Sequence, residues 1–344
     1  MRATNSFGGL PTGCWSDPRY KMGSHTTPST LPEFKVRLCR PDISPWLAGN
    51  TGIAGITTLD SHHPGPHVAV LSLMHGNELA GAIVLDQLLR AGLVPSRGKL
   101  SFGFLNLTAF DRFDPLRPTA SRFIDEDMNR VWDEAILSGP RHSIELDRAR
   151  EIRSFVDSVD VLLDLHSMLW PSEALILSGA PAKGRAMAKA IGTPSLVVAD
   201  HGHVNGRRLI DYPRFSCAET HYAACLVEAG QHWEQATVDT IQGSVAGLLR
   251  HLDVVGPDAP LPPAASVLPM RVATVTTAVT AMTSSFAFVR TYRGGDIIPR
   301  RDTLIAMDGE TEIRTPHDDC LLVMPSLRPS RGHTAVRLGQ FEAA

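Results

Sequence analysis

The chain has 344 residues, of which 43% are hydrophobic and 20% charged, so it can bury a full core and is neither a disordered nor a fibrous protein. Its 33 basic and 36 acidic residues leave a formal net charge of −3, which provides no strong field for attracting DNA or RNA, and we expect no nucleic-acid partner. The longest apolar stretches, such as His67–Met74, are far shorter than the ~20 residues that span a bilayer, so we expect no membrane insertion.

Residues 1–33 are rich in Gly, Pro, Ser and Thr and lack apolar periodicity, which predicts an irregular N-terminal arm. Residues 1–15 lack the continuous apolar segment of a secretory signal, and we therefore expect a cytoplasmic protein. The five cysteines, at positions 14, 39, 217, 225 and 320, are odd in number and form no C-x-x-C pair. This pattern argues against a disulfide framework and against a thiolate zinc site.

From residue 34 to residue 255, short apolar runs alternate with segments that have helical periodicity. The runs predicted as strands are His67–Met74, Lys99–Leu107, Val159–Leu165, Leu175–Ser178, Ser195–Ala199 and Ala223–Glu228. The segments predicted as amphipathic helices are Glu78–Ala91, Ser143–Val156, Ala182–Ile191 and Glu234–His251. Because several strands are apolar throughout, both of their faces are expected to be covered. The pattern predicts an α/β/α sandwich with a mostly parallel sheet.

A Pro-rich linker at 256–264 cannot continue a helix, and short β-rich runs with turn signals follow it. We therefore predict a catalytic α/β domain over 34–255 and a small all-β domain over 265–344.

Chemistry-bearing residues follow two of the predicted strands. His75 and Glu78 come directly after the run that ends at Met74, and Gly76 between them permits a tight turn. Open α/β folds place ligands at this carboxyl edge of the sheet. A His and a Glu three residues apart can converge on one cation, although this spacing alone is far more often that of an ordinary helix start.

A second strand ends in His166 at the same edge, which offers a third ligand. Two histidines and one glutamate form a ligand set of catalytic zinc with a position open for water. Asp164 points to the same strand face as His166 and could accept the other N–H of its imidazole. The alternative for His166 is an ordinary hydrogen-bonded histidine at a strand end. The alternative for Asp164 is an ion pair within the same cleft.

Glu228 ends a further apolar strand, where a carboxylate is costly unless it is paired or functional. It is the candidate general base and acid, with a salt-bridged strand-end glutamate as the alternative.

Between these motifs, the segment from 106 to 130 concentrates four arginines among acidic residues. Guanidinium groups bind carboxylates through two parallel hydrogen bonds, which suggests an anionic substrate, although such a cluster is also common in a solvated loop.

The order of the motifs resembles the aspartoacylase and succinylglutamate desuccinylase family, a branch of the zinc carboxypeptidase-like superfamily. The matching motifs are His-Gly-Asn-Glu at 75–78, Asn-x-x-Ala-Phe at 106–110, Arg-Phe-Ile-Asp-x-Asp-Met-Asn-Arg at 122–130, Asp-Leu-His at 164–166 and Val-Glu-Ala-Gly at 227–230. The resemblance covers about 35–255 and extends weakly over 265–344, where the family has a small β domain.

The resemblance implies one Zn2+ per chain, held by His75, Glu78 and His166, with Glu228 as the catalytic carboxylate. Arg122 matches the arginine that polarises the scissile carbonyl. Asn129 and Arg130 match the pair that holds the substrate carboxylate, and Asp127 is available to orient the arginines.

Two departures concern the substrate. The family's aspartoacylase has an arginine ten residues before the catalytic glutamate, where this chain has Ala218, with Arg214 nearby as a candidate replacement. A substrate-contacting tyrosine of the β domain is absent from Val323–Arg328, where Arg328 could substitute.

These features predict zinc-dependent hydrolysis of an N-acyl amide in a small carboxylate-bearing substrate. A zinc carboxypeptidase acting on short peptides and a catalytically silent protein that binds an anionic metabolite are the alternatives. The sequence leaves the formation of a homo-oligomer open. We expect His201 and His203 in a loop or lid rather than among the metal ligands.

Overall fold

The computed structural model describes residues 34–264 and 269–342, and Phe34–Ala344 forms one compact unit. The predicted arm of residues 1–33, with Cys14, lies outside the described residues, as do residues 265–268 at the predicted domain boundary.

A sheet of eleven strands runs through this unit in the order β1-β3-β2-β4-β7-β5-β6-β8-β14-β13-β10. In chain order its strands are β1 (Ile56–Asp60), β2 (His67–Ser72), β3 (Lys99–Phe104), β4 (Val161–Met168), β5 (Leu175–Leu177), β6 (Leu196–Ala199), β7 (Ala223–Gln231), β8 (Arg271–Thr280), β10 (Ile297–Ile298), β13 (Cys320–Val323) and β14 (Thr334–Phe341). From β3 to β8, every neighbouring pair is parallel except β5 with β7, which confirms the predicted mostly parallel α/β sheet.

The four long helices lie where their apolar spacing predicts them, with ends that differ by at most one residue. They are α1 (Leu79–Arg90), α4 (Ile144–Val156), α5 (Ala182–Ile191) and α7 (Gln235–His251). The shorter helices are α2 (Leu107–Asp111), α3 (Glu134–Leu137), α6 (Pro213–Ser216) and the 3-10 turns η1 (Ser44–Trp46), η2 (Met128–Arg130) and η3 (Leu209–Asp211).

Two apolar clusters cover the two faces of the sheet. Val68 and Val70 of β2 belong to the cluster that includes α1, α5 and α7, whereas Ala69 and Leu71 belong to the cluster that includes α4. Since successive side chains of a strand point to opposite faces, a strand buried on both sides is apolar at every position. This arrangement explains why the run before His75 shows no alternation.

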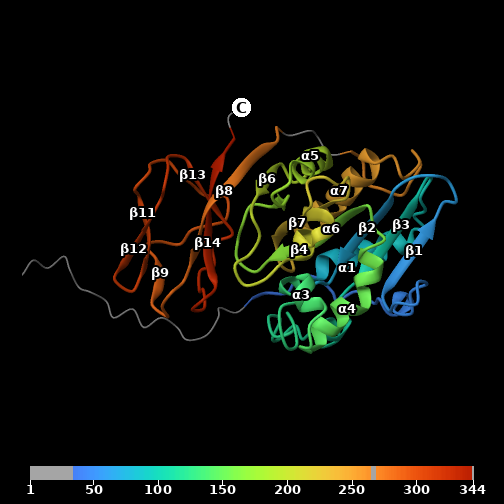
Figure 1. The fold of residues 1–344 in the computed structure, drawn as a ribbon, viewed down its shortest axis with the longest axis horizontal. Coiled ribbons are helices and arrows are strands. Elements are labelled where there is room, and N and C mark those ends of the chain that lie inside the picture. Colours follow the sequence, from blue (N-terminus) through green and yellow to red (C-terminus); the bar gives the residue numbers. More distant parts are fainter. Residues whose placement is uncertain (1–33, 265–268, 343–344) are drawn as a thin grey trace, which may run out of the picture. The chain divides into compact units, whose positions relative to one another are not determined.

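The strands that follow the Pro-rich segment continue the same sheet (Figure 1). β8 pairs in parallel with β6 and in antiparallel register with β14, and β13 and β10 extend the sheet beyond β14. A separate sheet of three antiparallel strands contains β9 (Phe286–Phe288), β11 (Leu304–Asp308) and β12 (Thr311–Arg314). The division of the chain into two domains stays a prediction, and the large sheet runs across the predicted division.

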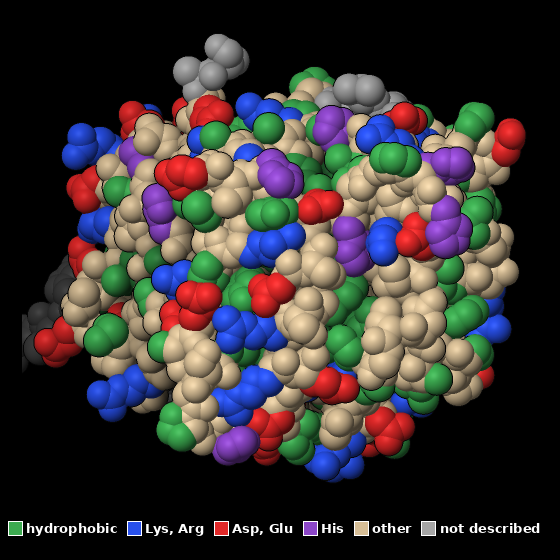
Figure 2. All heavy atoms as spheres, turned by 45° about the vertical axis from the view of Figure 1, so that its right-hand side comes forward, with side chains coloured by type: hydrophobic (Ala, Val, Ile, Leu, Met, Phe, Trp, Pro, Cys, Tyr) green, Lys and Arg blue, Asp and Glu red, His purple; other side chains and the backbone are tan. Residues whose placement is uncertain are grey.

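Among the helices of residues 34–264 and 269–342, none combines the length and apolar character needed to cross a bilayer. On the face shown in Figure 2, acidic and basic side chains are interspersed rather than separated.

Candidate active site

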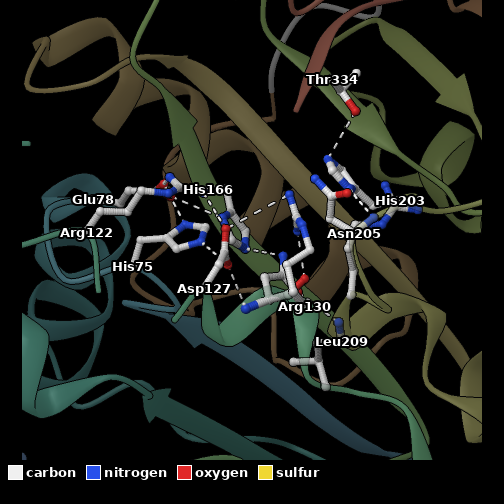
Figure 3. A network of polar contacts seen from close by, with 12 residues as sticks. His75, Glu78, Arg122, Asp127, Arg130, His166, His203, Asn205, Leu209 and Thr334 are labelled. Atoms are coloured by element: carbon white, nitrogen blue, oxygen red, sulfur yellow. Dashed lines mark hydrogen bonds and ion pairs between the residues drawn. The ribbon is translucent and has the colours of Figure 1, made fainter. Parts of the chain in front are cut away.

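Three ligand-type side chains meet where β2 and β4 end. These strands are parallel neighbours with Leu71 opposite Asp164, so the loop after β2 lies beside the end of β4. His75 and Glu78 lie in that loop and His166 lies in β4 (Figure 3). All three residues are buried, and one ligand atom from each lies within 4.8 Å of the others. The predicted group is therefore assembled and could hold a metal ion.

The sequence predicts a helix that begins at Glu78. In the structure, His75 and Glu78 instead lie in a turn that precedes this helix. The backbone N–H of Glu78 donates to the carbonyl of His75, and α1 begins only at Leu79. Gly76 is needed here for close approach and not for a positive φ, because a Cβ on it would lie 2.3 Å from the carbonyl carbon of Ala109.

Each imidazole is fixed between two carboxylates. Nδ1 of His75 lies 2.8 Å from Oε1 of Glu78, and Nδ1 of His166 lies 3.1 Å from Oε2 of the same side chain. The other ring nitrogens contact Oδ1 of Asp127 at 2.9 Å and Oδ2 of Asp164 at 2.8 Å. Carboxylates that bind the outer nitrogen of a metal-ligating histidine orient the ring and increase its basicity.

Opposite charges within this group shift the pKa values of its buried members. Burial alone would raise the pKa of Glu78, but His75 and His166 hold that pKa well below its usual range. Burial would lower the pKa of His166, but Asp164 and Glu78 raise it well above its usual range. Without a metal, the group therefore depends on a proton held among carboxylates. A divalent cation can supply the same positive charge, and the residues present fit one.

Glu228 lies in β7 directly opposite His166 of β4 and lines the same cavity. Its Oε2 is buried and has no hydrogen-bond partner among the described residues. Burial raises the pKa of this carboxyl to about 8. The site thus contains an uncommitted carboxyl that can accept or donate a proton.

Arg122 and Asp127 come from the loop between α2 and η2. Arg122 donates to Oε1 of Glu78 at 3.2 Å and to Oδ2 of Asp127 at 3.1 Å. The buried Glu145 of α4 anchors this loop by accepting the backbone N–H groups of residues 124, 125 and 126. Nothing in the local sequence distinguishes Glu145 from other helical glutamates, so this role cannot be predicted without the fold.

Asn129 and Arg130 also line the cavity. The side-chain oxygen of Asn129 accepts the backbone N–H of Leu209 at 2.8 Å, and Arg130 donates to the backbone carbonyl of Asn129 at 2.7 Å. Asn129 therefore connects η2 to η3, while most of the Arg130 guanidinium remains available to the cavity.

The cavity has a volume of about 220 Å³, which suits a small molecule. One part of its wall is apolar and includes Leu169, Trp170, Leu177, Leu226 and Met324. Another part is polar and includes Arg208 and His203 from the β6–β7 connection and Arg337 from β14. No local sequence pattern marks Arg208 or Arg337, and only the fold brings them to the site.

Two predicted substrate residues lie outside this cavity lining, and these placements are corrections. Arg214 donates to the carbonyl of Val159 at 2.6 Å and stacks on Tyr222, at the start of β4 rather than at its carboxyl end. Arg328 does not line the cavity, although Met324 and Pro325 from the same segment do. Ala218 is exposed and likewise absent from the lining, so counting ten residues back from Glu228 does not locate a substrate contact.

The fold and this group of residues define an α/β protein with a candidate metal centre at the carboxyl edge of its sheet. The model of the succinylglutamate desuccinylase/aspartoacylase catalytic domain matches residues 64–255, which is more than half of the chain. The chain therefore belongs to the succinylglutamate desuccinylase/aspartoacylase family, as its motifs predict.

Three individual relatives that match this chain share 30% sequence identity or less with it. Aspartoacylase from Xenopus tropicalis is 30% identical over 116 residues, and the match spans 30% of this chain and 35% of that protein. Succinylglutamate desuccinylase from Vibrio parahaemolyticus is 16% identical with a TM-score of 0.64, covering 84% of this chain and 87% of the other. A succinylglutamate desuccinylase/aspartoacylase from Rhodobacter sphaeroides is 19% identical with a TM-score of 0.60, covering 84% and 89%. At these identities the structural likeness shows the fold.

Proposed function

We propose that the protein is a zinc-dependent amidohydrolase that cleaves the N-acyl amide bond of a small carboxylate-bearing substrate. The observation that carries this proposal is the uncommitted carboxyl of Glu228 in the same cavity as the group of His75, Glu78 and His166. Membership of the desuccinylase and aspartoacylase family supports the class of reaction.

His75, Glu78 and His166 would hold the zinc ion, since two imidazoles and one carboxylate are one of the ligand sets of catalytic zinc. When bound, the ion supplies Lewis acidity toward the scissile carbonyl and lowers the pKa of water in the site.

Glu228 moves the proton in this proposal. Its Oε2 accepts a proton from the attacking water and then delivers that proton to the nitrogen of the leaving amine. Burial raises the pKa of this carboxyl from its ordinary value, which brings proton uptake and release closer to neutral pH.

Arg122 would stabilise negative charge that develops on the carbonyl oxygen. Its guanidinium lies beside Glu78 and retains N–H groups that point neither to Glu78 nor to Asp127. Arg130, beside Asn129, would hold a carboxylate of the substrate.

A screen of N-acetyl, N-succinyl and N-aroyl amino acids against the zinc-loaded protein tests this function. We expect turnover of at least one class, loss of turnover on chelation without unfolding, and recovery on adding zinc. Binding of these acids without turnover would instead indicate a silent binding protein. Cleavage confined to short peptides would indicate a carboxypeptidase, which the small cavity volume does not favour. Localisation to the cytoplasm is a separate prediction, which cell fractionation tests.

A further inference from the structure

Four arginines line the cavity, and two of them are already neutralised. Arg122 donates to Glu78 and Asp127, as described above. Arg208 donates to both carboxylate oxygens of Asp200, at 2.9 and 2.6 Å, and to those of Asp211, at 2.7 and 2.9 Å. Each of these two guanidinium groups is therefore already paired with two carboxylates.

Arg130 and Arg337 differ from this pair. The carboxylate of Asp127 is 4.0 Å from Arg130 and is already shared between His75 and Arg122. Arg337 lies 3.8 Å from Asp200, which Arg208 already occupies. No side-chain hydrogen bond of Arg337 is formed within the described part of the chain, and its side chain is only 10% exposed.

A buried guanidinium without a close partner is costly, because it loses water and gains no hydrogen bonds in return. Arg337 nevertheless lies on β14 with its side chain lining the cavity. A bound anion would supply the missing hydrogen bonds, and the cost of keeping this residue buried points to such a ligand.

Arg130 and Arg337 line the same cavity, and the charges of both act on His203. Burial, and then the charges of Arg130, Arg337 and Arg208, lower the pKa of His203 to about 3. Figure 3 shows His203 between Arg130 and Thr334, the first residue of β14. Burial also lowers the pKa of Arg130 to about 10. Asp127 opposes this shift, while the charges of Arg122, Arg208 and Arg337 add to it. Like charges in one cavity repel each other until an anion lies between them.

We propose that Arg337 is a specificity-determining residue, which together with Arg130 binds a carboxylate of the substrate. This inference rests on the proposed function. It adds to that function a residue of the C-terminal strands that binds the anionic group of the substrate. Arg214 and Arg328, the other arginines predicted to contact the substrate, are not among the residues that line this cavity.

The test compares Arg337→Gln with the wild type on the best N-acyl amino acid of the screen and on the carboxamide of the same compound. Gln removes the positive charge and most of the hydrogen-bond donors, while the carboxamide removes the charge from the ligand. We expect KM for the acid to rise by on the order of 30-fold or more, with a much smaller change in kcat and in the reaction of the carboxamide.

Arg331→Gln is the matched control, because Arg331 is exposed, precedes β14 and carries the same charge. This variant should retain the wild-type preference for acid over carboxamide. Arg337→Lys keeps the charge but loses the planar fork, and we expect a smaller rise in KM than in Arg337→Gln.

If folded Arg337→Gln keeps the wild-type ratio of acid to carboxamide, the inference is overturned. Should that variant fail to fold by circular dichroism, Arg337→Lys decides, and an unchanged KM in this variant also overturns it. A wild type that hydrolyses no N-acyl amino acid contradicts the proposed function instead. In that case calorimetric binding of the acid and the carboxamide to wild type and variant tests the subsite alone.

Discussion

At the scale of single residues, the imidazole of His166 is held by Asp164 on one side and faces Glu78 on the other. We expect His166→Ala to lose most of its zinc affinity, because a site with three protein ligands depends on each of them. Elemental analysis after dialysis against a weak chelator measures the effect. His201→Ala is the control, since His201 is exposed and does not line the cavity. Stoichiometric zinc in His166→Ala would show that the ligand assignment is wrong.

Glu228 offers a second prediction at this scale. Glu228→Gln should keep the fold and the zinc content while kcat falls by roughly 10²-fold or more, since an amide cannot transfer the proton. Gln is nearly isosteric and removes a buried carboxyl that has an unpaired oxygen, so the folded state should not lose stability. Steady-state kinetics and a thermal melt measure both quantities. Glu310→Gln, at an exposed turn, serves as the control, and an active Glu228→Gln protein would remove Glu228 from the mechanism.

The arginines of the site should differ in their kinetic effects. Arg122 lies beside Glu78 and would meet charge that exists only in the transition state, so Arg122→Ala should mainly lower kcat. Arg130 would meet a carboxylate that is present in the ground state, so Arg130→Ala should mainly raise KM for acids and affect their carboxamides much less. Wild-type protein that hydrolyses carboxamides as well as acids would contradict the role of Arg130.

At the scale of elements, the turn between β2 and α1 depends on the close approach of Gly76 to the loop at 109–121. A Cβ at Gly76 would lie 2.4 Å from the backbone nitrogen of Phe110 and 2.6 Å from the carbonyl oxygen of Ser121. We expect Gly76→Ala to lower the free energy of unfolding by about 1–3 kcal/mol and to weaken zinc binding, because backbone must move beside His75. Denaturant titration and zinc competition measure these effects. Gly256→Ala is the control, since a Cβ there meets no atom within 4 Å.

At the scale of the whole molecule, the continuity of the sheet from β6 through β8 to β14 determines how the protein unfolds. Ala273 of β8 is fully buried in the same apolar cluster as Leu196 of β6 and Leu321 of β13. We expect one cooperative transition, because strands on both sides of the predicted domain boundary share this core.

Two probes test this expectation in a single denaturant titration. Four of the five tryptophans, at positions 46, 132, 170 and 233, lie in the α/β part, so the fluorescence of a Trp15→Phe protein reports on that part. Amide exchange of β13 and β14 reports on the C-terminal strands. Coincident midpoints are expected. Loss of amide protection in β13 and β14 at a lower denaturant concentration would show that the C-terminal strands unfold as an independent domain.

The sequence by itself predicted strands β2 to β7, the four long helices and the three residues of the His-Glu-His group, but it did not predict β1. Continuous apolar runs identify strands buried on both faces, and the polar residues that end parallel strands must meet at one edge. His75, Glu78 and His166 could therefore be assigned together although about 90 residues separate them. The same logic placed Glu228, because its strand pairs with the strand of His166.

The motifs predict Arg122 and Arg130, which line the cavity, but only the tertiary structure places Arg208 and Arg337 there. Arg214 lies close to Glu228 in sequence, yet it is packed at the opposite end of β4, whereas Arg337 comes from a distant strand and lines the cavity. The physical reason is that a polar residue at the end of a strand can be recognised from the local sequence. The residues of a cavity wall are brought together by long-range strand pairing, such as that of β14 with β8. Glu145 likewise acts through a loop that approaches α4 only in the folded chain.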